Sequence, residues 1–265
     1  MSKRSHPTSR GDRLFLDRLT ELSDSAAESL SKYRGESLSL RSLTELSDAA
    51  AESLSKHKGD KLFLGVTELS DAAAGSLSKH KGWLSLEGLT ELSDAAAENL
   101  SKHNGGFLDL GPSIVSDSVV EILSKNSFVR IRGATELSDS VAESLSKFKG
   151  SFDLECLKEL SDSAAESLSK LNDCLCLDGL TELSDAAAES LSKHKGGFLS
   201  LNGLTKLSDS AAESLSKHKV SESIPWRWLS LSGLTSLSDA AAESLSKHED
   251  LGLDCGLEEQ VAQYR

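Results

Sequence analysis

The sequence predicts an α/β solenoid of stacked strand–turn–helix repeats around a parallel sheet, and three observations predict it. The tripeptide Leu-Ser-Asp, or a close variant, recurs along the chain, with its serines at 23, 47, 70, 93, 116, 138, 161, 184, 208 and 238. Neighbouring serines lie about 23 residues apart, and that spacing is typical of repeat architectures. A repeat this short cannot bury its own apolar face, so its neighbours must complete the core.

The first part of each repeat predicts a strand and then a helix start. In the repeat at residues 198–219, Leu199 and Leu201 alternate with residues of other types, which is the period of a short strand. Ser208 stands where a helix N-cap is expected, and Asp209 favours the positive end of that helix.

The second part of the repeat predicts a short helix with an inner and an outer face. Ala212 and Leu215 are spaced to face the core, whereas Glu213 and Lys217 form an i,i+4 pair on the outer side. In other repeats a glycine follows the helix and is expected to stop it, at Gly35, Gly59, Gly82, Gly150 and Gly196. Because helices are wider than strands, the stack is expected to curve, with the strands on its concave face.

The repeats divide the chain into three parts. Residues 1–12 are basic and polar, and we expect a disordered tail there. Residues 13–250 contain ten repeats of about 23 residues, with an insertion at 219–227 before the tenth. Residues 251–265 predict a partial last repeat and a polar C-terminal cap.

The repeated residues resemble those of leucine-rich-repeat proteins. The pattern L-x-L-x-G-L-T-x-L-S-D-x-x-A-x-x-L-S is closest to the cysteine-containing subclass, although the short repeats are bacterial-like. The match covers about residues 13–257, and its specificity comes from tenfold repetition. The resemblance implies a right-handed horseshoe with an inner parallel sheet and outer short helices, and it implies protein recognition.

One departure from that family concerns the turns after the strands. The family's ladder Asn or Cys is replaced by leucine, at Leu43, Leu89, Leu180 and Leu204. The turn amides therefore need another partner, for which the adjacent threonines are candidates, at Thr44, Thr90, Thr181 and Thr205.

Composition and charge exclude several classes of partner. The net charge is −13, which opposes binding to nucleic acids and to anionic membranes. No apolar run reaches the length of a membrane span, and the N-terminus lacks the apolar stretch of a secretory signal. The four cysteines form no paired framework, which favours a reducing compartment, so we expect a cytoplasmic protein.

Aromatic residues gather in two columns on the predicted concave face. The chain has 3 Trp, 2 Tyr and 7 Phe, and seven of these lie at the first or middle strand position of their repeats. Trp83, Phe107 and Phe128 stand in consecutive repeats, and we expect them to anchor a partner. A charged border is expected from Asp109, Arg130, Arg132, Asp153 and Glu155, with Arg130 and Arg132 selecting acidic partner groups. The alternative is that these rings pack along the sheet edge.

The insertion at 219–227 provides a second candidate surface. It contains Trp226 and Arg227 and leads into Trp228, and both residue types are favoured at interface hot spots. The alternative is a duplication scar whose tryptophans fold back onto the solenoid.

Residues with metal or redox chemistry give weaker signals. Six of seven histidines share one repeat position, at His57, His80, His103, His194, His218 and His248. Because Tyr33, Phe148 and Leu171 fill that position elsewhere, we interpret it as a semi-buried packing position and not as a metal site. Cys174 and Cys176 lie two residues apart, which leaves a soft-metal or redox site as a weak alternative.

The repeated serines and aspartates are expected to be helix caps, and no nucleophile elbow or phosphate-binding loop is present. The sequence therefore predicts a non-catalytic scaffold without cofactor that binds a protein or peptide. Self-association through the ends of the array or the tryptophan insertion is the competing hypothesis.

Overall fold

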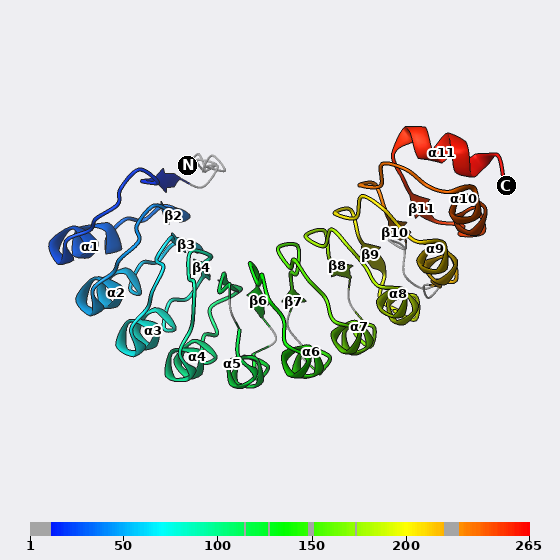
Figure 1. Ribbon diagram of the computed structural model, residues 1–265. Helices are drawn as coiled ribbons and strands as arrows, with labels where there is room; N and C mark the ends of the chain where they lie inside the picture. The colour runs from blue at the N-terminus through cyan, green and yellow to red at the C-terminus, as the bar shows by residue number, and fades with distance from the viewer. Residues whose placement is uncertain (1–11, 114, 127, 148–150, 173, 220–227) are drawn as a thin grey trace, which may run out of the picture. The chain divides into compact units, whose positions relative to one another are not determined.

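The computed structural model describes residues 12–113, 115–126, 128–147, 151–172, 174–219 and 228–265. It divides the chain into two compact units, residues 1–110 and 111–265. Within the described residues of each unit, a short strand followed by a short helix is the repeating element (Figure 1). The predicted α/β repeat solenoid is confirmed in each unit. The predicted horseshoe outline and its right-handed winding concern both units together and stay predictions. Most of the predicted N-terminal tail lies outside the described residues.

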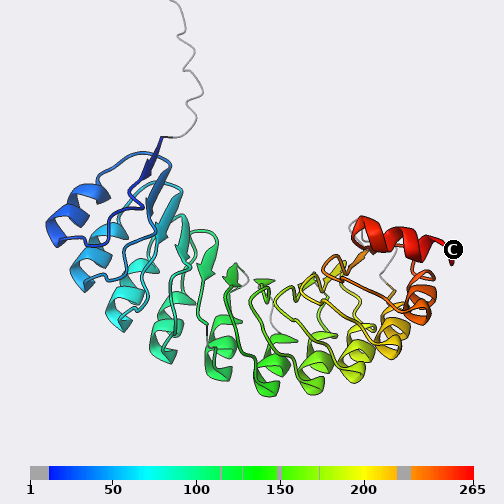
Figure 2. The same cartoon turned by 45° about the horizontal axis from the view of Figure 1, so that its top comes forward.

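The first unit contains five strands and four helices among its described residues. They are β1 (Arg13–Phe15), α1 (Asp24–Ser31), β2 (Ser37–Leu40), α2 (Asp48–Leu54), β3 (Lys61–Leu64), α3 (Asp71–Leu77), β4 (Trp83–Leu86), α4 (Asp94–Leu100) and β5 (Leu108–Leu110). Consecutive strands pair in parallel from β1 to β5. Figure 2 shows these strands side by side, with the helices along the other side of the unit.

The second unit continues the same alternation in its described residues. It contains α5 (Asp117–Leu123), β6 (Val129–Ile131), α6 (Asp139–Leu145), β7 (Ser151–Phe152), α7 (Asp162–Leu168), β8 (Leu175–Cys176), α8 (Asp185–Leu191), β9 (Phe198–Ser200), α9 (Asp209–Leu215), β10 (Trp228–Ser230), α10 (Asp239–Leu245), β11 (Leu251–Gly252) and α11 (Cys255–Ala262). Strand β6 pairs in parallel with β7, and β8 to β11 form a second parallel set.

The core lies between the strands and the helices and is built from small layers. Most repeats contribute leucines from the strand, and alanines with a leucine from the helix, whereas α5 and β6 contribute valines and an isoleucine. In the second repeat, Leu38, Leu40, Ala50 and Leu54 are all fully buried. Burial of such aliphatic side chains stabilises the fold by about 25 cal/mol per Å² of apolar surface. Because each layer is completed by the next repeat, the stabilisation depends on stacking.

Every helix of the ten repeats begins at the predicted serine N-cap. The hydroxyl of Ser93, for example, accepts a hydrogen bond from the backbone N–H of Ala96 at 3.0 Å. The same hydroxyl donates to a carboxylate oxygen of Asp71, one repeat earlier, at 2.7 Å. In the second unit Ser184 donates likewise to Asp162. In these repeats the aspartate that begins one helix therefore also binds the serine cap of the next helix, which the residue pattern alone does not predict.

The glycines after the helices have a different role from the predicted one. In the described residues the only positive φ angles belong to Gly106 and Gly133, so Gly35, Gly59 and Gly82 do not form left-handed helix caps. A Cβ atom at Gly59 or Gly82 would collide with a backbone oxygen of the preceding repeat. Glycine is required at these positions because neighbouring backbones approach closely.

The threonines after the strands link neighbouring repeats through their main chains. The backbone N–H of Thr67 donates to the carbonyl oxygen of Thr44 at 3.0 Å, and Thr90 donates in the same way to Thr67. The hydroxyl of Thr67 donates to that same carbonyl, at 3.3 Å. The predicted threonine therefore does accept a hydrogen bond from a turn amide, but with its backbone carbonyl oxygen and not with its side-chain hydroxyl.

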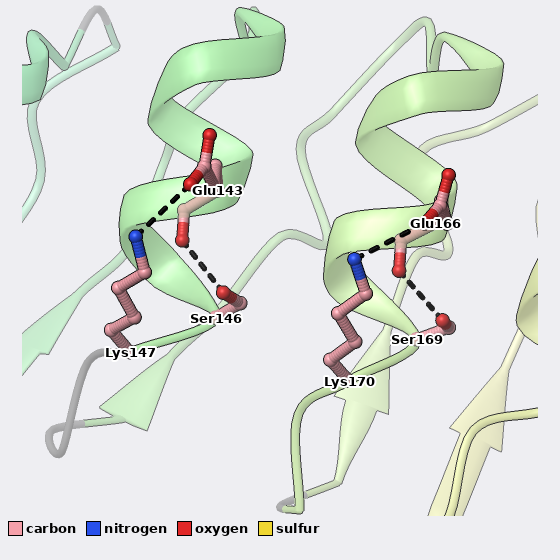
Figure 3. A network of polar contacts seen from close by, with 6 residues as sticks. All are labelled: Glu143, Ser146, Lys147, Glu166, Ser169 and Lys170. Atoms are coloured by element: carbon pink, nitrogen blue, oxygen red, sulfur yellow. Dashed lines mark hydrogen bonds and ion pairs between the residues drawn. The ribbon is translucent and has the colours of Figure 1, made fainter.

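The outer faces of the helices carry the predicted ion pairs. Lys217 lies 2.9 Å from Glu213 on α9. Figure 3 shows the equivalent pairs on α6 and α7, where Lys147 lies 3.0 Å from Glu143 and Lys170 lies 3.2 Å from Glu166. Because these side chains are exposed, each pair contributes little to the stability of the fold.

The last repeat is followed by α11, which covers α10. Gln260 donates a hydrogen bond to the carbonyl oxygen of Leu237, and Arg265 donates to that of His248. Residues 251–265 thus form a final strand and a helix that packs on the last repeat, as both figures of the chain show (Figures 1 and 2).

Candidate functional site

The aromatic residues of the strand side are exposed to very different degrees. Phe107 is 46% exposed, Phe128 59% and Trp228 45%, whereas Trp83 is half-buried. Rings with this much free surface are not covered by the sheet edge. The smaller residues of the middle column are covered, since Ser39 and Ser85 are buried.

In the first unit three rings form one contiguous group, the aromatic patch, which consists of Phe63, Trp83 and Phe107. The ring centroids of Phe63 and Trp83 are 5.8 Å apart at 58°, and those of Trp83 and Phe107 are 6.0 Å apart at 63°. Tilted and edge-to-face pairs are favoured because the positive ring edge meets the negative face of its neighbour. Parallel pairing of β3 with β4 places Phe63 opposite the small Ser85, which leaves room for this contact.

Trp83 is held in place by a buried carboxylate. Its indole Nε1 donates a hydrogen bond to Oδ2 of Asp109 at 3.0 Å. The sequence predicts Asp109 in an exposed charged border, but the structure buries it completely. Asp109 lies opposite the small Ser85 in the register of β4 with β5. It therefore orients Trp83 and cannot meet a partner directly.

Two cations flank the patch. The Arg41 guanidinium lies 4.5 Å from the ring centroid of Phe63, and the Lys61 ammonium 5.9 Å from that of Trp83. Each is also part of an ion pair, Arg41 with Glu87 at 2.8 Å and Lys61 with Glu36 at 3.2 Å. These contacts limit the movement of both rings and surround an apolar centre with charge.

Sequence reasoning missed Phe63, Arg41 and Lys61 as members of this site. The signal was present, because Phe63 and Lys61 lie in the repeat directly before Trp83. Parallel register pairs Lys61 with Trp83 and places Phe63 two residues further along. Phe63 and Trp83 belong to different columns, so their contact is diagonal and does not follow from either column alone.

The remaining predicted residues lie in the second unit. Phe128 and the half-buried Arg130 and Arg132 lie on β6 and its flanks. The pKa of Glu155 is raised, mainly by the carboxylate of Asp153, while the Arg132 guanidinium acts in the opposite direction. Within the second unit Phe128 retains its exposed ring, but its continuity with Phe107 stays a prediction.

Of the insertion at 219–227 the structure describes only Lys219, together with Trp228, which follows the insertion. Trp228 begins β10 and packs edge-to-face on Phe198, with centroids 5.2 Å apart at 81°. Trp226 and Arg227 lie outside the described residues, as does the rest of 220–227. The described part therefore provides a second, two-ring aromatic surface.

The two cysteines of β8 and its flank are free thiols. Burial, followed by the carboxylates of Asp178, Glu155 and Asp153, raises the pKa of the Cys176 thiol to about 11. A thiol must ionise to act as a nucleophile or metal ligand, so this environment disfavours the redox or soft-metal alternative. In the described residues no group of three or more His, Cys, Asp or Glu side chains is placed to hold a metal ion.

An open groove of about 680 Å³ runs along the turns between strands and helices in the first unit. It is lined by the repeated Thr-Glu-Leu segments at 44–46 and 67–69 and by Glu91, Leu92 and Ser93. The lining repeats the same residue types, so the groove brings together none of the unique constellations that catalysis requires.

Comparison with known proteins adds little to this description. No protein-family model and no curated protein sequence matches the chain. Among solved structures, the chain is similar to an internalin from Listeria monocytogenes, with 15% sequence identity and a TM-score of 0.43. The match covers 89% of this chain and 74% of the internalin. Among the described residues, no helix is both long enough and apolar enough to cross a bilayer.

Proposed function

We propose that this protein is a non-catalytic scaffold that binds another protein or a peptide through its strand side. The aromatic patch of Phe63, Trp83 and Phe107 is the principal anchor. Contiguous exposed aromatic groups with a charged border are typical of interaction sites. The cytoplasmic location expected from the sequence is part of this proposal, and the four free cysteines support a reducing compartment.

The observation that carries the proposal is the fixed position of Trp83. Its ring contacts Phe63 and Phe107, and its N–H is bound to the buried Asp109. A side chain that is already fixed loses little conformational entropy when a partner binds, so more of the contact energy appears as affinity. Phe107, with nearly half of its surface free, provides the contact area.

The proposal is tested by affinity capture from the source lysate with three forms of the protein. These are the wild type, the double variant Trp83→Ala/Phe107→Ala, and the control Phe15→Ala. Phe15 is a good control because it is 62% exposed on β1 of the same unit but makes none of the described ring contacts. We expect the wild type and Phe15→Ala to retain a protein that the double variant loses.

The identified protein is then titrated against all three forms by calorimetry. Loss of an aromatic hot spot costs at least about 2 kcal/mol, or roughly 30-fold in Kd. Circular dichroism of the double variant must show the wild-type spectrum. Equal affinities for the wild type and the double variant would refute the patch as the anchor.

Self-association is the second candidate, and the first repeat favours it. In the described residues β1 lies at the edge of its sheet, with Leu14 half-buried and Leu19 36% exposed, whereas α11 covers the last repeat. An uncovered apolar edge is a surface for pairing with another chain. Light scattering over a hundredfold range of concentration distinguishes the two candidates, because a constant mass excludes self-association.

A further inference from the structure

Six histidines lie just after their helices, each at the same point of its repeat. The backbone N–H of His80, for example, donates to the carbonyl oxygen of Leu77 at 3.0 Å, which closes the end of α3. Their rings form two series, the histidine ladders. The first ladder consists of Tyr33, His57, His80 and His103, and the second of His194, His218 and His248.

The rings of Tyr33, His57 and His80 in the first ladder stack almost parallel, one from each repeat, and so do the three histidine rings of the second ladder. The His57 ring lies 6.0 Å from that of Tyr33 and 6.2 Å from that of His80, at angles of 5° and 7°. The His218 ring lies 6.3 Å from that of His194 and 5.9 Å from that of His248, at 10° and 8°. His218 therefore has an imidazole stacked on both faces, whereas His80 stacks on His57 and interacts electrostatically with His103.

The inner rings are shielded from water and poorly provided with hydrogen bonds. His80 is 0% exposed and His218 is 4% exposed. Neither ring makes a side-chain hydrogen bond of normal geometry with a described residue, although backbone carbonyls of His57 and His194 lie close enough to favour the charged form weakly. Burial, followed by the flanking histidines, lowers the pKa of both His80 and His218 to about 4. Both rings are neutral at pH 7.

The charged groups around the ladders do not offset this effect. Among the described residues, the charges that act on His80 are those of His57 and His103, and Lys81 opposes a charge on His103. Burial is the main cause of the lowered pKa of His57.

The end of the second ladder has mixed surroundings. Asp250 and Glu249 favour a charge on His248 and Arg265 opposes it, yet burial outweighs them and its pKa is lowered. The groups that act electrostatically on a protonated His80 or His218 are therefore the flanking imidazoles, and no carboxylate among the described residues stabilises the charge.

Packing alone does not require histidine at this position. Tyr33 occupies it in the first repeat and Leu171 in the seventh, and both repeats form a short helix with a serine N-cap. A leucine would bury apolar surface there without introducing a group that binds protons. Histidine in six repeats therefore adds a property that the fold itself does not need.

We propose that the two histidine ladders make the repeats acid-sensitive, so that protonation of the stacked rings opens the helix C-terminal ends that these histidines close. Because the folded protein holds the rings neutral, the unfolded chain binds the protons more tightly. The stability that depends on the inner rings is therefore fully present above their ordinary pKa of 6.5, and it is lost as the pH falls from 6.5 to about 4. Stacked positive charges then repel one another along each ladder.

Opening of the first ladder also reaches the strand side. His80 and Trp83 belong to one continuous helix-to-strand segment, and so do His103 and Phe107. Acid is therefore expected to displace the aromatic patch, and its effect on a bound partner rests on the function proposed above. The ladders themselves are tested without any partner.

The test measures urea unfolding by circular dichroism at pH 7 and pH 5 for the wild type and His80→Leu. For one inner histidine, the linkage relation gives an unfolding constant about 20-fold larger at pH 5 than at pH 7. We expect the ratio of the unfolding constants at pH 5 and pH 7 to lose this factor in His80→Leu for the first unit and in His218→Leu for the second. Leucine is chosen because Leu171 occupies the same position. The control His6→Leu removes a histidine outside the ladders and is expected to keep the wild-type pH dependence.

An unchanged ratio between pH 5 and pH 7 in both leucine variants overturns the proposal. Should a variant fail to fold, the wild type still gives an answer. Proton NMR of its ring Cε1–H resonances follows each histidine from pH 7.5 to 4. Titration of His80 and His218 below about pH 5 is the expected result, and titration of both near their ordinary value of 6.5 contradicts the proposal.

Discussion

Trp83 of β4 donates its indole hydrogen to the buried carboxylate of Asp109 on β5, across 3.0 Å and from one repeat to the next. The two residues are diagonal neighbours on parallel strands, where long side chains come within reach of each other. A buried residue of one repeat thus determines where an exposed surface of its neighbour stands.

Replacement of Asp109 by alanine is expected to destabilise the first unit by about 1–3 kcal/mol, because the indole N–H loses its acceptor. The Trp83 side chain should then occupy several orientations, and partner affinity should fall although Asp109 is not exposed. Urea unfolding followed by tryptophan fluorescence, in a background with Trp226→Phe and Trp228→Phe, measures the first effect. Asp109→Asn retains an oxygen acceptor and should lose less. Equal stabilities of Asp109→Ala and the wild type would falsify this role.

The serine caps are expected to differ in strength according to their second hydrogen bond. Ser184 caps α8 and also donates to Asp162, whereas Ser138 caps α6 and contacts Ser140. Removal of a cap costs about 1 kcal/mol, and loss of an inter-repeat hydrogen bond adds up to about 1 kcal/mol. Ser184→Ala should therefore destabilise the second unit more than Ser138→Ala, as measured by urea midpoints. Equal losses would show that the bond to Asp162 contributes nothing.

Two glycines of the third repeat are expected to respond to alanine in opposite directions. A Cβ atom at Gly82 would collide with the backbone of Asp60, whereas a Cβ atom at Gly75 in α3 would meet only the Asn99 side chain, at 3.5 Å or more. Gly82→Ala should destabilise the first unit by about 1–3 kcal/mol through overpacking. Gly75→Ala should stabilise it by about 0.5–1 kcal/mol, because glycine is a poor helix former. Thermal unfolding of the two variants measures both signs, and a stable Gly82→Ala would contradict the close approach.

The repeat itself made the fold predictable. Leucines at a period of two, a serine cap and inward alanines recur in step, so each repeat confirms the interpretation of the others. The strand side was predictable for the same reason, because alternation determines which residues face away from the core.

The degree of exposure on the strand side was harder to predict. Whether a residue there is covered depends on the size of side chains on both flanking strands. Asp109 and Ser85 are covered, whereas Phe107 in the same region is not. The histidine position was correctly predicted as a packing position, but the parallel stacking of His57 on His80 requires the spacing between repeats. One column of sequence does not contain that information.

Cys176 provides the sharpest test of the strand side in the second unit. Burial, followed by the carboxylates of Asp178, Glu155 and Asp153, raises the pKa of its thiol to about 11, from an ordinary value of 9.0. At pH 8 its thiolate fraction should be about 100-fold smaller than that of an ordinary cysteine, and alkylation should be slower in proportion.

The rate is measured with iodoacetamide at pH 8, followed by mass spectrometry of the peptide that contains Cys176. Asp178→Asn removes the carboxylate with the largest effect and should accelerate alkylation, because the thiolate is then less disfavoured. Glu166→Gln is the matched control, since Glu166 lies on the outer face of α7 in its pair with Lys170 (Figure 3). Alkylation of Cys176 as fast as that of an unhindered peptide thiol would contradict the shielding of this thiol. It would also restore the redox hypothesis for Cys174 and Cys176, because a reactive thiolate is the first requirement of such a site.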